Sequence, residues 1–264
     1  MAAILECVPN ISEGRDLEKV EKILDEVRNT KGVKLLDYSS DKDHNRSVIT
    51  FLGEPEAVIE AAYKLTKKAT ELIDMTTHTG GHPRMGAVDV IPLIPIKDIT
   101  IEEAVELSKK LGEKIGSECN MHVTLYESSA SAPHRTNLAD VRRGQYEGME
   151  EKIKEEKWIP DYGPQQFNVN AGIVAVGARP PLVAYNINLA TSDVKIAKNI
   201  ANVIRAAKGG FVYCKAMGLL IEETGKAQVS MNLVNPDFTT IFRVFDTVER
   251  EAARYGVAVT DSEI

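Results

Sequence analysis

The sequence predicts an α/β protein of two subdomains, because one order of elements occurs twice along its 264 residues. In each half a strand is followed by a helix, two strands and a second helix, the order of a split β-α-β, ferredoxin-like unit. The chain is 43% hydrophobic and long enough to bury two cores. We expect subdomains at residues 1–178 and 179–264, each with a mixed β-sheet and helices on its outer face, and with the two sheets facing each other across a cleft.

Hydrophobic periodicity predicts the elements of the first half in order. They are strand 2–8, helix 16–29, strands 33–39 and 46–52, helix 55–73, strand 87–94, helix 100–117 and strand 121–126. Glu54-Pro55 opens the helix at 55–73, since proline is tolerated in a first helical turn. Residues 128–172 are polar and rich in Pro and Gly, and this segment is long for a connector. The sequences LADVRRG and EGMEEKIKEEKW predict short helices within this segment.

The second half repeats the pattern from residue 182. Its predicted elements are strand 182–189, helix 192–206, strands 211–221 and 226–234, and helix 237–255. Thr191-Ser192-Asp193 supplies an N-cap for the first helix, and Asn235-Pro236 is expected to open the second. We interpret the repetition as a structural duplication, although the matching identities are too few to establish common ancestry.

Composition excludes several classes of protein. The net charge of −7 disfavours nucleic acid as the main partner, because binding many phosphates needs a concentrated basic face. No window approaches the roughly 18 apolar residues of a membrane span, and the N-terminus lacks the basic region of a signal peptide. Cys7, Cys119 and Cys214 are widely spaced and odd in number, which favours reduced thiols. We therefore expect a soluble, cytoplasmic protein.

Residues 78–90, HTGGHPRMGAVDV, are the strongest candidate site. This segment holds two imidazoles, a guanidinium, a carboxylate and three glycines. Histidine titrates near neutral pH and is suited to moving protons during catalysis. Glycines let the backbone approach a ligand, and Pro83 stiffens the turn after His82. The alternative interpretation is an ordinary turn rich in Gly, Pro and His.

The two histidines of this segment do not form a typical metal site. His78 and His82 are spaced i, i+4, which on a helix would suit a divalent metal, but Gly80-Gly81 and Pro83 make a helix improbable. The segment also lacks the glutamate of an HExxH pattern. We expect no metal, and general acid/base catalysis by one of the two histidines.

Other polar residues are candidates for ligand contacts. Asn45 and Arg46 follow a turn and begin a strand, so their side chains could reach a substrate beside the sheet. Several arginines near Gly or Pro could bind an anionic small molecule, the alternative being scattered surface charge. They are Arg84, Arg135, Arg142, Arg143 and Arg179.

Two polar rows in the second half are also candidates. Asn186 and Asn188 share one face of a strand, as do Gln228, Ser230 and Asn232 of another, because side chains alternate along strands. Polar side chains on a buried sheet face need partners, and a polar cavity between the sheets would supply them.

An amide-rich loop precedes the boundary between the halves. Its residues are Gly163, Pro164, Gln165, Gln166, Phe167, Asn168, Val169, Asn170, Ala171 and Gly172. Side-chain amides can match the donor and acceptor edge of a heterocycle such as a pteridine, and the single aromatic ring could stack on it. A plain surface loop is the alternative.

These motifs together resemble the formiminotransferase family, that is, the tetrahydrofolate-dependent glutamate formiminotransferases of histidine breakdown. The resemblance rests on CVPNISEGR at 7–15, DHNR at 43–46, the segment 78–90, PDYGP at 160–164, GAR at 177–179, NINL at 186–189 and QVSMN at 228–232. It extends in order over nearly the whole chain.

The resemblance implies transfer of a formimino group from N-formimino-L-glutamate to N5 of tetrahydrofolate, the co-substrate. It implies that folate lies in the cleft between the subdomains, that His82 is the general base, that the loop 163–172 contacts folate, and that the protein is a homodimer. One imidazole with a near-neutral pKa could accept the N5 proton and then protonate the departing glutamate nitrogen.

Two alternatives remain open within this resemblance. Relatives that process 5-formyltetrahydrofolate would use the same base and loop, and a non-catalytic folate-binding module would use His82 structurally. The chain ends at Ile264, where this family continues with a further strand and helix, so we expect a truncated second subdomain or a short variant. It also lacks the cyclodeaminase domain of the bifunctional animal enzyme, so ammonia release would need another protein.

Overall fold

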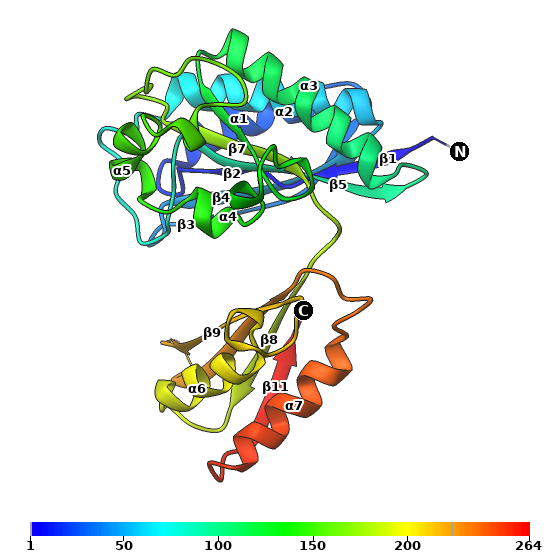
Figure 1. Cartoon of the computed structure of the whole chain (residues 1–264), viewed down its shortest axis with the longest axis vertical. Coiled ribbons are helices and arrows are strands. Elements are labelled where there is room, and N and C mark those ends of the chain that lie inside the picture. The colour runs from blue at the N-terminus through cyan, green and yellow to red at the C-terminus, as the bar shows by residue number, and fades with distance from the viewer. Residues whose placement is uncertain (1, 223) are drawn as a thin grey trace. The chain divides into compact units, whose positions relative to one another are not determined.

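A computed structural model describes residues 2–222 and 224–264. The chain forms two compact units, divided between Arg179 and Pro180 (Figure 1). Each unit has its own β-sheet, its own helices and its own hydrophobic core. The predicted α/β class with two sheets is therefore confirmed.

The first unit contains a seven-stranded mixed sheet. Its strands are β1 (Ile4–Cys7), β2 (Asn10–Ile11), β3 (Val33–Asp41), β4 (Arg46–Gly53), β5 (Val88–Lys97), β6 (His122–Leu125) and β7 (Ile173–Ala178). Strands β1 and β2 both lie between β4 and β5 as one interrupted strand, and every pairing from β3 to β5 is antiparallel. Strands β5, β7 and β6 are parallel neighbours.

Strand β7 was absent from the predicted elements. All six of its residues, Ile-Val-Ala-Val-Gly-Ala, are buried, because both faces of the sheet are covered at this position. A strand buried on both faces shows no alternation of polar and apolar residues, which is the signal that identifies strands in a sequence.

Three helices cover one face of this sheet: α1 (Leu17–Arg28), α2 (Pro55–Leu72) and α3 (Ile101–Glu118). Their ends follow from local chemistry. Asp16 caps α1, Pro55 occupies the first turn of α2, and Thr100 with Glu103 forms a capping box at α3. Their apolar faces pack on the sheet around buried residues that include Leu5 and Phe51.

The opposite face of the first sheet is also partly covered. The irregular segment after β6 carries the short helices α4 (Leu138–Val141) and α5 (Gln145–Lys152), as the sequence predicted. Met149 and Trp158 from this segment pack with Val90 of β5 and Ile173 of β7 in a separate apolar cluster. This part of the sheet face is not left bare, in contrast to our expectation for a unit with helices on one side only.

The second unit is a four-stranded antiparallel sheet with two helices. Its elements are β8 (Val183–Leu189), α6 (Val194–Ile204), β9 (Cys214–Ile221), β10 (Lys226–Leu233), α7 (Ile241–Ala253) and β11 (Val259–Glu263), with strand order β11-β8-β10-β9. Helix α7 begins at Ile241 and not at 237, because Thr240 is its N-cap and residues after Pro236 form a turn closed by Asn235. Strand β11 was not predicted, since its sequence VTDSE is polar and mostly exposed.

Two glycines hold the motif segment against the loop 163–172. Gly86 and Gly172 form a bridge between these segments, and Ala87 donates its backbone N–H to the Ala171 carbonyl at 2.8 Å. A methyl group on Gly86 would overlap the carbonyl oxygens of Ala171 and Ile173. Gly172 also adopts a φ of +71°, which favours glycine.

We predict that Gly86→Ala destabilises the first unit by about 1–3 kcal/mol, because the new methyl group has no room. Gly148→Ala is the matched control. A methyl group at Gly148 meets nothing within 4 Å inside α5, so this variant should gain about 0.5–1 kcal/mol of helix stability.

Urea unfolding followed by tryptophan fluorescence measures both changes in the correct unit, since Trp158 is the only tryptophan and is buried there. Equal midpoints for Gly86→Ala and the wild type would contradict the close approach of the two segments.

Candidate active site

A small hollow in the first unit brings together five of the residues that the sequence singled out, namely Asn45, Arg46, His78, His82 and Arg84. It has about 10 Å³ of free space and lies among β2, β4, β5 and the motif segment. The residues that line it are Asn10, Ile11, Ser12, His44, Asn45, Arg46, His78, His82, Arg84 and Asp89. The two motif histidines therefore share one site with Asn45 and Arg46, which come from a separate strand pair.

Asn45 connects the motif segment to the rest of the hollow. Its backbone has a φ of +48°, a left-handed conformation that asparagine tolerates better than most residues. Its side-chain oxygen accepts the Gly14 N–H at 3.0 Å, and its amide nitrogen donates to the Thr79 carbonyl at 3.0 Å. The turn between β3 and β4 is thereby fixed to both the start of α1 and the motif segment.

Both ring nitrogens of His78 are occupied within the protein. Nε2 lies 2.9 Å from the Asn45 carbonyl oxygen, which can only accept, and Nδ1 lies 3.2 Å from Nε of Arg84, which can only donate. These partners assign the proton of a neutral ring to Nε2. Burial is the main cause that lowers the pKa of His78 and favours this neutral form. Proton transfer by His78 would require the loss of one of these hydrogen bonds.

Arg84 is also engaged by protein groups. Its guanidinium makes a two-point ion pair with Glu147 of α5, at 2.8 and 2.6 Å, and lies 5.9 Å from the centre of the Tyr146 ring. The residue is only 8% exposed. Arg84 therefore joins the motif segment to α5.

His82 has a different environment from His78. Its ring is half-buried and meets the ring of His44 edge-on, with the centroids 6.0 Å apart. Burial, followed by the positive charges of Arg46 and Arg142, lowers the pKa of His82 to about 4. The imidazole is therefore neutral at physiological pH, with a lower pKa than the near-neutral value that we expected.

The charges next to His82 come from three elements. Arg46 of β4 donates through Nε and Nη2 to the side-chain oxygen of Asn10, at 2.7 Å for Nε. Arg142 forms an ion pair with Asp89 of β5, and Asp89 also accepts the Met85 N–H at 3.0 Å. Burial raises the pKa of Asp89, which is only 3% exposed, and the charge of Arg142 opposes this shift.

The sequence pointed to some of these residues and not to others. Asp89 was part of the candidate segment 78–90 and Arg142 was one of the arginines that could bind an anion, whereas Asn10 stood only inside a family motif. Glu147 had no signal at all, because it is 63 positions from Arg84 and resembles any surface glutamate of a short helix.

The loop 163–172 is held in place largely by its own asparagine. The side-chain oxygen of Asn168 accepts the backbone N–H groups of Asn170 and Ala171, both at 3.1 Å. Gln165 and Gln166 are exposed. The Phe167 ring packs on the ring of Tyr146, with centroids 5.5 Å apart, so the loop shares a neighbour with Arg84.

The polar rows of the second unit lie together on one sheet face. Register pairs Gln228 with Asn188 and Ser230 with Asn186. Gln228 donates to the Asn188 side chain at 2.9 Å, and Asn188 in turn donates to Asp261 of β11. Gln228 is buried, whereas Asn186, Asn188 and Ser230 are partly exposed and Asn232 is exposed, so much of this face is accessible.

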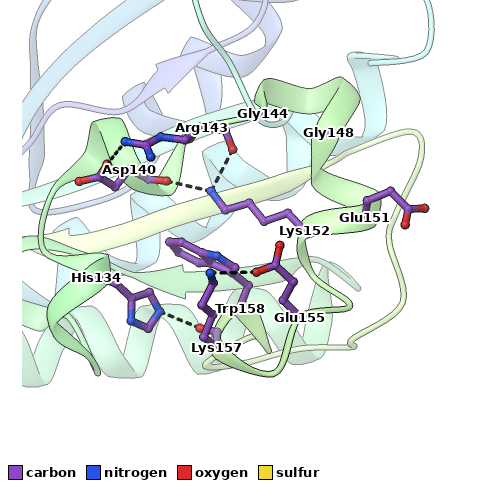
Figure 2. A pocket seen from close by; sticks show the side chains of 10 residues that line it. All are labelled: His134, Asp140, Arg143, Gly144, Gly148, Glu151, Lys152, Glu155, Lys157 and Trp158. Carbon is purple, nitrogen blue, oxygen red and sulfur yellow. Dashed lines mark hydrogen bonds and ion pairs between the residues drawn. The ribbon is translucent and has the colours of Figure 1, made fainter.

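A larger, open hollow of about 500 Å³ lies beside α4 and α5 (Figure 2). Lys152 extends across it over the Trp158 ring, at 3.9 Å from the centroid, and donates to backbone carbonyls of Asp140, Val141 and Arg143. Burial lowers the pKa of Lys152 to about 8. Charged residues that line this larger hollow form ion pairs with one another, as Lys157 does with Glu155 at 3.0 Å. The hollow beside His82 is therefore the better candidate for the active site.

The described part of the chain offers neither a cluster of metal ligands nor a membrane-spanning helix. Residues 2–222 and 224–264 contain no cluster of three or more His, Cys, Asp or Glu side chains that could hold a metal ion. None of the helices described there has the length and apolar character needed to cross a membrane.

Comparison with known proteins identifies the family. The model of the formiminotransferase domain, N-terminal subdomain, matches residues 4–179, and that of the formiminotransferase domain matches residues 184–264. Glutamate formimidoyltransferase of Streptococcus pyogenes serotype M1 is 52% identical over 264 residues, covering 100% of this chain and 88% of the relative. The enzyme of the same name from Thermoplasma acidophilum is 46% identical, covering 99% and 87%.

A bifunctional animal protein is also similar. Formimidoyltransferase-cyclodeaminase of Mus musculus is 39% identical over 269 residues, covering 100% of this chain and 50% of the mouse protein. The matches to the two models and to these relatives extend over the whole of both units. The chain therefore belongs to the formiminotransferase domain family.

Proposed function

We propose that this chain transfers the formimino group of N-formimino-L-glutamate to N5 of tetrahydrofolate, giving 5-formiminotetrahydrofolate and L-glutamate. Relatives that are 52% and 46% identical over nearly the whole chain carry the name glutamate formimidoyltransferase. The structural observation that carries the proposal is a neutral imidazole, His82, in a hollow lined by polar and cationic side chains. Tetrahydrofolate is the co-substrate.

His82 acts as the general base and then as the general acid. The lone pair of N5 attacks the amidine carbon of the donor, and neutral His82 accepts the proton that N5 releases. The resulting imidazolium then protonates the glutamate nitrogen as its bond to the former amidine carbon breaks. The proton moves from one substrate nitrogen to the other, and holding both substrates together supplies much of the remaining acceleration.

His78 positions His82 and does not exchange protons. Its two hydrogen bonds fix the chain four residues before His82, and Arg84 with Glu147 fixes it two residues after. Arg84 is accordingly a structural partner of the segment in this proposal, although it was a candidate for substrate binding.

The remaining candidates contribute to ligand binding. The hollow has only about 10 Å³ of free space, far below the roughly 300–1,000 Å³ of typical ligand pockets, so a folate would reach His82 only if the side chains that line the hollow moved apart. The exposed amides of the loop 163–172 are proposed to contact folate. The polar face formed by Asn186, Asn188, Gln228, Ser230 and Asn232 is proposed as a further ligand-contacting surface. The units divided near residue 178 would serve as the two subdomains.

The proposal includes a location and an assembly state. Cys7, Cys119 and Cys214 are all free, which favours a reducing compartment such as the cytoplasm. The homodimer is proposed from family resemblance alone, and sedimentation at several protein concentrations would test it.

Replacing His82 should abolish most of the turnover. We predict that His82→Ala lowers kcat by about 10²–10⁴-fold, the usual contribution of a general acid/base, while tetrahydrofolate still binds. Product formation from tetrahydrofolate and N-formimino-L-glutamate measures this, with His134→Ala, in the other hollow, as the control. Wild-type transfer by His82→Ala would contradict the assigned base. Turnover of 5-formyltetrahydrofolate alone, or folate binding without turnover, would favour one of the two alternative functions.

The same substitution at each motif histidine separates their roles. Glutamine can donate to the Asn45 carbonyl and accept from Arg84, so His78→Gln should retain most of kcat, within about tenfold. His82→Gln cannot accept a proton and should lose activity as His82→Ala does. If His78→Gln is the less active variant, the two roles are reversed.

The acidic limit of activity should lie well below pH 6.5. The base must be unprotonated, so kcat/KM for the donor should fall as the pH decreases through the pKa of His82, about 4 in the free site. A pH–rate profile tests this expectation. It is measured over the pH range in which Trp158 fluorescence shows that the first unit is folded. An acidic limb centred at 6.5 or above would contradict the environment described for His82.

A further inference from the structure

Arg46 has no carboxylate partner among the residues that the structure describes. Its Nε and Nη2 groups both donate to the neutral side-chain oxygen of Asn10. The residue is half-buried and lines the hollow that contains His82. A guanidinium withdrawn from water is normally paired with a carboxylate, whereas an amide satisfies its hydrogen bonds and leaves its charge uncompensated.

The nearby acidic groups do not supply the missing charge. Asp89 is in an ion pair with Arg142. Asp41, whose charge also acts on Arg46, faces His44, with its Oδ2 at 2.8 Å from Nδ1 of that ring. Burial lowers the pKa of Arg46, and the like charge of Arg142 lowers it further. The positive charges of two guanidinium groups, Arg46 and Arg142, therefore act on this site, and one fully buried carboxylate, Asp89, opposes them.

Arg142, the second guanidinium near His82, has a buried atom without a hydrogen-bond partner among the described residues. Nε of Arg142 is buried and has no hydrogen-bond acceptor in residues 2–222 or 224–264. The side chain as a whole is 19% exposed. The hollow and its surroundings therefore hold unused N–H groups and an excess of positive charge, in a protein whose net charge is −7.

We propose that Arg46, with Arg142 as a second positive charge, binds a carboxylate of the formimino donor beside His82. This inference rests on the proposed function, because N-formimino-L-glutamate supplies the carboxylates. A guanidinium presents paired N–H groups that match the two oxygens of a carboxylate. Binding there would hold the amidine carbon of the same molecule next to the imidazole.

Binding of a carboxylate at Arg46 would change the environment of His82. Burial, and then the charges of Arg46 and Arg142, lower the pKa of His82. A bound carboxylate would compensate those charges and raise the pKa of His82 from about 4 toward 6.5. The imidazole would then become a stronger base when the donor is present.

Arg46→Gln tests the binding role. The glutamine amide can still donate to the Asn10 oxygen, but it carries no charge. We expect the KM for N-formimino-L-glutamate to rise by about 10–100-fold, while the KM for tetrahydrofolate changes little. Arg143→Gln is the matched control, because the side chain of this neighbouring arginine is 80% exposed and forms an ion pair with Asp140 on the same short segment. An unchanged donor KM, or an equal rise in both KM values, would overturn the proposal.

A titration that needs no turnover tests the effect on His82. The chain has five histidines, whose ring signals can be followed by NMR. The signal that is missing from the spectrum of His82→Ala is that of His82. Saturating L-glutamate, the product, should raise the pKa of His82 in the wild type and leave it unchanged in Arg46→Gln. The α-amide of glutamine, which lacks both carboxylates, should have no effect. An unmoved pKa in the wild type would refute the inference.

The two proposals can fail separately. If glutamate raises the pKa of His82 but the protein transfers no formimino group, the carboxylate site survives and the proposed function does not. If transfer occurs and both Arg46 tests are negative, only the carboxylate site is rejected. Should Arg46→Gln fail to fold, Arg142→Gln replaces it, with the same direction expected for both measurements.

Discussion

The candidate site depends on the hydrogen bonds of His78, whose two ring nitrogens both bind groups of the protein itself. His78 is fixed between the Asn45 carbonyl and the Arg84 guanidinium, and Arg84 is fixed in turn by Glu147. These contacts join β4, the motif segment and α5. The glycine-rich chain around His82 would otherwise have many conformations, so restraints on both sides are what present its ring in one place. The left-handed backbone of Asn45 is part of this arrangement.

Charge gives the same site its chemical character. His82 is surrounded by positive groups although the chain carries a net charge of −7, because Arg46 and Arg142 are gathered from distant parts of the first unit. Such a local field attracts anionic ligands and adds to burial, the larger effect, in keeping the imidazole unprotonated. In the proposed reaction the base is neutral and the substrates carry carboxylates, so the same two arginines would contribute to both requirements.

The sequence predicted those elements whose signals are local. Helices α1, α2 and α3 follow from amphipathic periodicity, and the start of α2 also from Pro55 in its first turn. Their observed ends lie within a residue or two of the predicted ends, and the structure adds the N-caps Asp16 and Thr100. Strand β7 escaped because burial on both faces removes the alternation of its residues. The predicted start of helix α7 was too early, because Pro236 opens a turn and not the helix. Strand β11 was missed because it is a strand only through its pairing with β8.

The sequence by itself determined the family and singled out the candidate residues, which are the motif at 78–90 and the polar rows. Local sequence does not separate His78 from His82, which differ little in their immediate neighbours. Only the tertiary structure gives the two rings different environments, because the groups that bind His78 and the cations beside His82 come from elsewhere in the chain. Asn45 lies 33 positions from His78, and Arg142 pairs with Asp89 across 53 positions. The reactivity of an imidazole follows from such contacts, which form only when the chain has folded.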